Sequence, residues 1–310
     1  MKIKQVIFYF LIVFLLTSCS MFSPTIKDDS EIVVADLTGD NRQFILAGLP
    51  SYVDEDNVFR IVDEKELALL TIIQEKEDIL KVFFVSDNVI SIDKTFAYIE
   101  SVIPYPFNII MTEIPYTRNG ETLLTLQSIE IKPNNDNYAD IFRDGEAWNK
   151  NILKASFTDK EKIKAIHDQI IISTQYDTSI LDIDLSASVR HPSFEATGVF
   201  SYSTAVCSGY SRAFNVLAQN AGIPSIMVSS ISMLHAWNLV YDGVSWKFID
   251  TTFNDPIPDR ANRVLYTYYL LNKNQFIQDG KHIFDDSSDT TLSAEEYIEF
   301  AEYVYPETKP

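Results

Sequence analysis

Cysteine, glycine-rich loops and positive charge are all scarce in this chain of 310 residues, and each scarcity excludes a class of protein. The two cysteines and four histidines form no group with zinc-ligand spacing, and no glycine-rich segment of the kind that binds phosphate is present. The 44 acidic residues outnumber the 25 basic ones, and the net charge of −19 opposes binding to nucleic acid. The hydrophobic content of 46% is ordinary for a globular protein and sufficient for a sizeable core.

The one long hydrophobic run begins near the N-terminus and ends just before a cysteine. It extends from Val6 to Leu16, follows two lysines, and leads into Leu-Thr-Ser-Cys, which ends at Cys19. Eleven apolar residues suit the core of a signal peptide and are too few to span a bilayer. The pattern resembles a bacterial lipoprotein signal, which implies that residues 1–18 are removed and that Cys19 is lipidated. The alternative is an ordinary secretory signal cleaved nearby, with Cys19 an incidental thiol.

Both interpretations place the mature chain outside the cytoplasm. Under the first, acyl chains on Cys19 anchor the exported protein to the bacterial cell membrane without a spanning helix, and the polar segment 19–30 is a tether. No later segment of the sequence is long and apolar enough to span a membrane. Loss of the signal removes two lysines, so the net charge of the mature chain becomes −21.

Cys207 is the only cysteine that remains once Cys19 is lipidated, so no intramolecular disulfide can form. Exported proteins usually pair their cysteines, and an unpaired one is therefore a candidate reactive thiol. The alternative is a buried residue that acts as a small apolar side chain. The count of cysteines alone does not decide between the two.

The segment 31–135 has the pattern of a small α+β domain. Its acidic and aromatic residues form no recognisable catalytic group, so its role is left open. A strong hairpin signal, Arg118-Asn119-Gly120, joins two of its β-rich runs. The expected strands are 31–37, 43–48, 80–85, 89–92, 107–116 and 122–131, and the expected helices begin at residue 63 and cover 94–102.

A polar, turn-rich stretch at 133–137 predicts the boundary to a second domain, 138–310. Two helical patterns are expected at its start. The first covers 138–154, and the second opens with a capping box at Thr158 and carries a stripe of isoleucines. His167 on the second helix is expected at the surface or at a boundary.

Cys207 stands at the start of a third helical pattern. Apolar residues recur there at 210, 213, 214, 217, 218 and 221, and Gly222-Ile223-Pro224 ends the pattern as a helix stop does. Ser203 or Thr204 is expected to cap its start. The unpaired N–H groups and the helix dipole at this end favour a negative charge, and the thiolate is the nucleophilic form of cysteine.

Two short segments downstream predict a β-hairpin around Asp242-Gly243. A two-residue loop gives the pairs Tyr241 with Val244, Leu239 with Trp246, Trp237 with Phe248, and His235 with Asp250. His235 and Asp250 then lie directly opposite each other on one face, with Cβ atoms about 5 Å apart. At that distance a carboxylate can orient an imidazole toward a nucleophile.

Three motifs in this order, AVCSGYSRAFNVLAQNAGIP, HAWNLV and WKFIDTTF, resemble the bacterial transglutaminase-like domains of the papain-like cysteine hydrolase group. The resemblance implies an α+β fold in which a helix that begins at the cysteine packs against an antiparallel sheet. It implies Cys207 as nucleophile, His235 as general base and acid, and Asp250 as the residue that orients His235. It also implies an oxyanion hole that includes the Cys207 N–H, with a second donor from the preceding loop, for which Tyr202 is the candidate.

The expected function is therefore that of a thiol enzyme that acts on amide bonds of a protein or peptide substrate through a thioester, with no metal or organic cofactor. Hydrolysis is favoured over crosslinking, because no second site for an acceptor amine is recognisable. Two alternatives remain open. One is a catalytically silent surface module that binds peptides or assembles envelope proteins. The other, the least favoured, is a zinc site formed by Cys207, His235 and Asp250.

Overall fold

The computed structural model describes most of the chain from Phe59 onward. The described residues are 59–76, 84–86, 88–118, 121–134, 138–182, 191–255, 257–260 and 262–308. The predicted signal peptide, Cys19, the tether and the expected strands 31–37 and 43–48 lie outside them. Each helix within the described residues is too short or too polar to cross a membrane.

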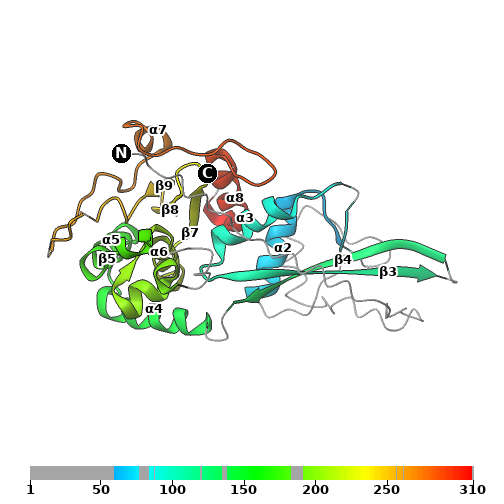
Figure 1. Ribbon diagram of the computed structural model, residues 1–310, viewed down its shortest axis with the longest axis horizontal. Coiled ribbons are helices and arrows are strands. Elements are labelled where there is room, and N and C mark those ends of the chain that lie inside the picture. Colours follow the sequence, from blue (N-terminus) through cyan, green and yellow to red (C-terminus); the bar gives the residue numbers. More distant parts are fainter. Residues whose placement is uncertain are drawn as a thin grey trace.

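The first part of the described chain contains a four-stranded sheet. β1 (Phe59–Arg60) pairs in parallel with β2 (Phe84–Val85), which pairs in turn with β4 (Glu121–Pro133). β4 forms a long antiparallel hairpin with β3 (Phe107–Arg118), and Figure 1 shows this hairpin projecting from the rest of the molecule. The hairpin predicted around Arg118-Asn119-Gly120 is therefore confirmed.

α2 (Glu64–Lys76) and α3 (Ile92–Val102) pack against each other beside this sheet. The strand predicted at 89–92 is wrong, because Val89 is almost fully exposed and α3 already begins at Ile92. Ser91 starts that helix: its hydroxyl accepts a hydrogen bond from the Lys94 N–H, which the helix itself leaves unpaired.

The second part of the chain is built around a three-stranded antiparallel sheet, in the order β7 (Ser225–Ser230), β8 (His235–Tyr241) and β9 (Trp246–Ile249). α6 (Cys207–Asn220) packs against β7 and β8, and α4 (Tyr138–Ile152) and α5 (Asp159–Ser173) pack against α6 (Figure 1). The fold is therefore α+β, with the cysteine at the start of a helix that packs on an antiparallel sheet.

The remaining elements connect these helices and strands. The capping box predicted at Thr158 is present at the start of α5, and the isoleucine stripe of that helix is buried. The other elements are β5 (Gln175–Tyr176), β6 (Thr204–Ala205), the short helical turns η1 (Thr178–Asp182), η2 (Pro192–Phe194), η3 (Gly198–Tyr202) and η4 (Pro306–Thr308), and the helices α7 (Lys273–Phe276) and α8 (Ala294–Val304).

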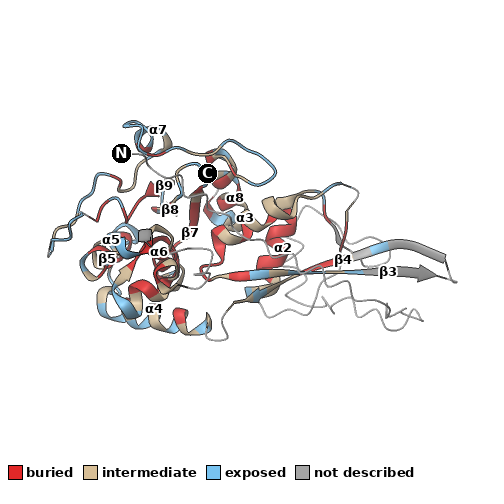
Figure 2. Cartoon of the chain, in the orientation of Figure 1, coloured by how far each residue is buried: buried red, intermediate tan, exposed pale blue. Residues whose placement is uncertain are grey.

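One hydrophobic core extends through both parts of the chain. Tyr98 of α3 belongs to the same buried cluster as Phe214 of α6, Trp237 of β8 and Phe300 of α8. The Tyr98 and Phe300 rings lie 4.5 Å apart, and Figure 2 shows buried segments in α2 and α3 as well as in α6 and the neighbouring strands. The boundary predicted near residue 135 is thus crossed by a shared core, and the domain limits themselves stay a prediction.

Three polar side chains on one face of α6 bind the C-terminal end of α3. The contacts are Arg212 to Glu100 (2.7 Å), Asn215 to the Ser101 carbonyl (3.2 Å) and Gln219 to the Val102 carbonyl (2.9 Å). Because the last carbonyls of a helix have no partner within it, the contacts of Asn215 and Gln219 satisfy backbone groups that α3 leaves open, and Arg212 adds an ion pair with a side chain of that helix. The first part of the chain therefore holds the helix that begins at Cys207.

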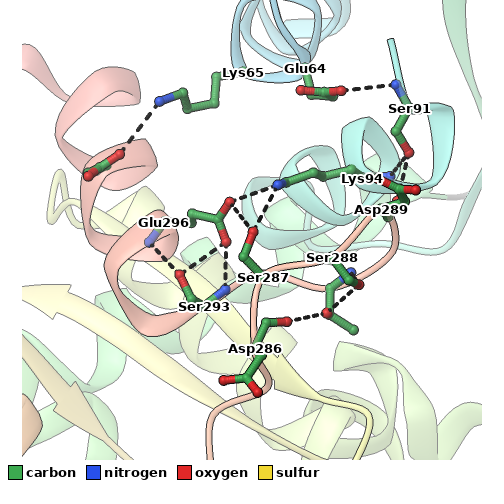
Figure 3. Close-up of polar contacts among 12 residues, drawn as sticks. Glu64, Lys65, Ser91, Lys94, Asp286, Ser287, Ser288, Asp289, Ser293 and Glu296 are labelled. Atoms are coloured by element: carbon green, nitrogen blue, oxygen red, sulfur yellow. Dashed lines mark hydrogen bonds and ion pairs between the residues drawn. The ribbon is translucent and has the colours of Figure 1, made fainter. Parts of the chain in front are cut away.

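The C-terminal segment returns to the first part of the chain through the polar contacts drawn in Figure 3. Lys94 of α3 forms an ion pair with Glu296 of α8 at 2.8 Å, and the Ser91 hydroxyl donates to the Asp289 carbonyl at 2.6 Å. Glu296 also completes a capping box with Ser293 at the start of α8. Partly exposed ion pairs are each worth at most about 1 kcal/mol, so these contacts mainly set the position of the segment.

The first turn of α6 lies directly on η2. The Val206 N–H donates to the Ser193 carbonyl at 2.9 Å, and a Cβ atom on Gly209 would lie 2.4 Å from that same oxygen. A backbone carbonyl cannot move aside as the end of a flexible side chain can, so only glycine allows this approach. Gly209 thereby determines how closely Cys207 is held to η2.

Gly209→Ala is expected to lower the free energy of unfolding by about 2–4 kcal/mol, measured by urea denaturation. The clash with backbone outweighs the gain of about 1 kcal/mol in helix propensity. Gly222→Ala in the turn after α6 is the control, because its new Cβ would meet no atom within 4 Å and its cost is limited to about 1–2 kcal/mol of left-handed backbone strain. Equal losses in the two variants would show that the Ser193 carbonyl is not the constraint.

Candidate active site

α6 begins at Cys207 without a side-chain cap. Val206 occupies the cap position, and its apolar side chain makes no capping hydrogen bond to the first N–H groups of the helix. The prediction that Ser203 or Thr204 caps the helix is wrong: Ser203 ends η3 in the left-handed conformation, with φ of 55°, and Thr204 belongs to β6, where it pairs with Gln175 of β5. The strand leads almost directly into the helix, which leaves no turn for a cap. The uncapped N–H groups favour an anion at this position.

β8 and β9 pair in a register that differs by two residues from the predicted one. The observed pairs are Tyr241 with Trp246, Val240 with Lys247, Leu239 with Phe248, and Asn238 with Ile249. The predicted direct pairing of His235 with Asp250 is therefore wrong. A shift of two residues nevertheless keeps every side chain on its face of the sheet, because side chains alternate with a period of two.

The shift arises in the hairpin loop, which has four residues instead of two. The Asp242 carboxylate accepts hydrogen bonds from the N–H groups of Val244 and Ser245, each at 2.9 Å. Gly243 takes the left-handed conformation, with φ of 87°, that such a turn needs. The side chain of Asp242 thus stabilises a wider loop than the Asp-Gly pair alone predicts.

His235 and Asp250 meet despite the shifted register. His235 Nε2 lies 2.7 Å from Asp250 Oδ2, and the Cys207 thiol interacts with the same imidazole. The His235 side chain is 8% exposed and that of Asp250 is fully buried, while Cys207 is half-buried with its Sγ 4.0 Å from the Leu234 carbonyl. Phe253 stacks on the His235 ring at 4.3 Å between centroids. The structure therefore brings together the three residues singled out in the sequence.

The two buried groups shift each other's protonation. Burial lowers the pKa of His235, but the charge and hydrogen bond of Asp250 and the contact with Cys207 outweigh it and raise the pKa to about 10. Burial raises the pKa of Asp250, but the charge and hydrogen bonds of His235 and His282 outweigh it and lower the pKa to about 2. An imidazolium beside a carboxylate is thus the favoured state of this pair at neutral pH.

A further residue, His282, belongs to this group and was not predicted from the sequence. Its Nε2 lies 2.8 Å from Asp250 Oδ2, the same oxygen that His235 contacts, and its side chain is fully buried. It lies between α7 and α8, outside any helix or strand. No periodicity or spacing pointed to it, because it reaches the site only through the folding of the chain.

A second network holds the backbone at Asp250, and it corrects the expectation for His167. That residue, expected at the surface or at a boundary, is fully buried, and its Nε2 lies 3.0 Å from Asn254 Nδ2. Asn254 Nδ2 also donates to the Tyr268 carbonyl at 3.1 Å, and the same carbonyl accepts the Asp250 N–H at 2.9 Å. The helical pattern did not reveal this burial, because Tyr266, which covers the His167 ring, is distant in sequence.

Tyr202, the candidate second donor of an oxyanion hole, ends η3 and is 63% exposed. Its carbonyl accepts a hydrogen bond from the Thr204 hydroxyl at 3.3 Å. Its side chain is thus free to adjust on the surface before α6. Its part in an oxyanion hole stays a prediction.

Three side chains of the site have atoms arranged closely enough to be considered as metal ligands. Atoms of His235, Asp250 and His282 all lie within 4.8 Å of one another, whereas Cys207, part of the zinc site considered from the sequence, is not among them. The nitrogen–oxygen distances of 2.7 and 2.8 Å are hydrogen-bond lengths. Ligands about 2.0–2.1 Å from a tetrahedral zinc ion lie roughly 3.3 Å apart. We therefore interpret this group as hydrogen-bonded.

Comparison with known proteins identifies the part of the chain that contains this site. Residues 146–251 match the family described as the transglutaminase-like superfamily. These residues form a transglutaminase-like domain. The matched range includes Cys207, His235 and Asp250, and it ends before His282.

The chain also has a distant relative among characterised proteins. The kyphoscoliosis peptidase of Mus musculus is 24% identical over 147 residues, which are 41% of this chain and 22% of that protein. The alignment thus spans about a fifth of the relative's length.

Two crystal structures also match. A protein named as a TGase is 16% identical with a TM-score of 0.27, and the match covers 56% of this chain and 51% of that one. A candidate cysteine protease from Cytophaga hutchinsonii is 12% identical with a TM-score of 0.28, and the match covers 51% and 69% of the two chains.

The pair formed by His235 and Asp250 predicts a pH-dependent stability. The pKa of His235 is raised from 6.5, so its contribution is complete below pH 6.5 and is lost as the pH rises toward about 10. The pKa of Asp250 is lowered from 3.8, so its contribution is complete above pH 3.8 and is lost as the pH falls toward about 2. The pair therefore stabilises the fold most between these two ordinary pKa values.

His235→Gln is expected to lower the free energy of unfolding by about 1–3 kcal/mol near pH 5.5 and by clearly less near pH 9. Urea denaturation at both pH values measures the difference. Lys150→Gln serves as control, since it changes an exposed side chain of α4 outside the Asp250 network and should give the same small change at both pH values. A loss from His235→Gln that stays constant or grows toward high pH would contradict the raised pKa.

Proposed function

We propose that the protein is a thiol enzyme that acts on amide bonds of proteins or peptides. One observation carries the proposal: the His235 imidazole is bound at 2.7 Å to the fully buried Asp250 carboxylate and interacts with the half-buried Cys207 thiol. The match of residues 146–251 to the transglutaminase-like superfamily supports it, as does the similarity to a protein named as a peptidase. Its substrate and its reaction type are parts of the proposal.

His235 is suited to both proton transfers of the first half-reaction. Because Nε2 is bound to Asp250, Nδ1 is the ring nitrogen left to hold the proton of the Cys207 thiol, and the imidazolium favoured at neutral pH is the form that carries this proton beside the thiolate. The thiolate adds to the amide carbonyl carbon, and the tetrahedral intermediate then breaks its carbon–nitrogen bond. The departing amine takes the proton from His235, and the acyl group stays on Cys207 as a thioester.

The start of α6 is suited to stabilise the oxyanion of that intermediate. The Cys207 N–H lies in the first turn of a helix that has no side-chain cap, so it is open to an acceptor. We assign the second donor to the segment before the helix, with Tyr202 as the candidate. Each such donor typically lowers the barrier by a few kcal/mol.

The second half-reaction decides between hydrolysis and crosslinking. In hydrolysis, the oxygen of a water molecule adds to the thioester carbonyl carbon while His235 takes a proton from that water. The carbon–sulfur bond then breaks, and the Cys207 sulfur leaves and is reprotonated by His235. In crosslinking, an amine takes the place of water. We favour hydrolysis, because an acceptor amine requires a second site that excludes water, and no residues of the sequence point to one.

The enzyme is proposed to act outside the cytoplasm, anchored to the bacterial cell membrane through Cys19. Only the sequence supports this, since residues 1–58 lie outside the described part. Two or more acyl chains on one cysteine suffice for stable anchoring, because each buried methylene contributes about 0.8 kcal/mol. The substrate would then be a protein or peptide within reach of the tether.

The thiol of Cys207 is expected to react with iodoacetamide at neutral pH about tenfold faster, or more, in the folded protein than in the urea-unfolded chain. The reason is that His235 can hold the proton of the thiol. The mature chain with Cys19→Ser has Cys207 as its only thiol, so mass spectrometry measures the rate directly. His235→Ala is expected to remove most of the acceleration.

Lys150→Ala is the control for this labelling, since it removes an exposed side chain of α4 and should leave the rate unchanged. The proposal of an enzyme is overturned if the Cys207 thiol reacts no faster in the folded protein than in the unfolded chain and if His235→Ala leaves its rate unchanged. That result would favour a catalytically silent surface module with the same fold.

Lipidation predicts that the full-length chain, expressed in a bacterium fed with an alkyne-tagged fatty acid, incorporates the tag and sediments with membranes. Cys19→Ser should abolish the tag and release the protein from the membrane fraction. Cys207→Ser is the control and should retain the tag. Equal tagging of wild type and Cys19→Ser would contradict lipid attachment at Cys19.

A further inference from the structure

The segment between α7 and α8 places a second histidine on the carboxylate of the proposed catalytic group. We propose that His282 is a positioning residue whose Nε2–H fixes the Asp250 carboxylate in the orientation that holds His235 against Cys207. The inference rests on the proposed function, since it concerns the same site, and it adds a residue that lies beyond the matched range 146–251.

Asp250 accepts hydrogen bonds at both of its carboxylate oxygens. Oδ1 accepts from the Phe253 N–H at 2.9 Å, and Oδ2 contacts His235 Nε2 at 2.7 Å and His282 Nε2 at 2.8 Å. A fully buried carboxylate needs several charge-assisted hydrogen bonds to offset its loss of hydration. With His282 in place, Oδ2 is held even while His235 gives up and regains its proton during the reaction.

The surroundings of the His282 ring determine which nitrogen carries its proton. Nδ1 is buried, and no described residue forms a hydrogen bond with it. A proton on Nδ1 would be buried without an acceptor, which is costly, whereas a proton on Nε2 donates to Asp250. The geometry therefore makes His282 a donor toward Asp250.

Contacts on both sides of His282 hold it in this position. The Phe276 ring packs against it at 3.9 Å between centroids. Farther along, the Asp285 carboxylate accepts the N–H groups of Ile231 and Ser232 at 2.6 and 3.1 Å. Ile231 and Ser232 belong to the turn that leads into β8, the strand that begins at His235. The segment that contains His282 and Asp285 thus binds both the Asp250 carboxylate and the turn that precedes His235.

Two substitutions distinguish the effect of the His282 hydrogen-bond donor from the effect of its aromatic ring. His282→Phe keeps an aromatic ring among its aromatic neighbours but removes the donor, and His282→Gln removes the ring but keeps an amide N–H near the position of Nε2. If His282 positions Asp250, His282→Phe should slow iodoacetamide labelling of Cys207 at neutral pH by about tenfold or more, as loss of such supporting contacts typically does. His282→Gln should remain within about threefold of wild type. A role in packing alone predicts the reverse order.

The assay uses the full mature chain with Cys19→Ser, and urea denaturation measures the stability of each variant. Phe284→Leu is the control: its ring packs on Trp237 and Phe248 in the same aromatic cluster, so the variant disturbs the cluster, leaves the donors to Asp250 unchanged, and should label at the wild-type rate. A measurement without substitution at His282 complements it, since ¹⁵N NMR of the histidine rings should show that His282 carries its proton on Nε2.

The positioning role is overturned if His282→Phe labels at the wild-type rate, if His282→Gln is as slow as His282→Phe, or if NMR finds the proton on Nδ1. Failure of the proposed function gives a different result. In that case the wild-type thiol reacts no faster than the unfolded chain and His235→Ala changes nothing, and the positioning role falls with it.

Discussion

A fully buried carboxylate is the constraint on which the rest of the site depends. Asp250 has no exposed surface, so its charge is tolerated only because the Phe253 N–H, His235 and His282 all bind it. These contacts lower the pKa of the carboxyl and, in return, raise that of His235. The favoured ionic state of the proposed catalytic pair is thus a consequence of burial together with the number of donors.

Elements from four separate regions of the chain meet at that carboxylate. β8 supplies His235, the end of β9 leads into Asp250, α6 begins at Cys207, and the segment before α8 supplies His282. α5 also supports the site, because its buried His167 binds the side-chain amide of Asn254. That amide and the Asp250 N–H both donate hydrogen bonds to the Tyr268 carbonyl. The backbone and the side chain of Asp250 are therefore held by different parts of the fold, which resists rotation of the carboxylate.

The first part of the described chain contributes through support. The end of α3 binds three side chains of α6, and the shared core passes from α3 through α6 to β8. The polar contacts of α8 with α2 and α3 keep the C-terminal segment, which includes His282, against the same body (Figure 3). We therefore interpret α3 and its neighbours as a support that fixes the position of Cys207. This interpretation does not concern the projecting hairpin of β3 and β4.

Local patterns in the sequence were sufficient for the helix that starts at Cys207, for the capping box at Thr158 and for the long hairpin of β3 and β4, because each depends on residues close together in the chain. They also placed His235 and Asp250 on one face, since the period of a strand survives a shift of two residues. The register depends on a local contact that the Asp-Gly pair alone did not reveal, that of the Asp242 side chain with its own loop. Only the tertiary structure decided the burial of His167. It alone brought His282 onto Asp250, because a contact made by an irregular segment depends on how the whole chain closes and leaves no periodic trace in the sequence.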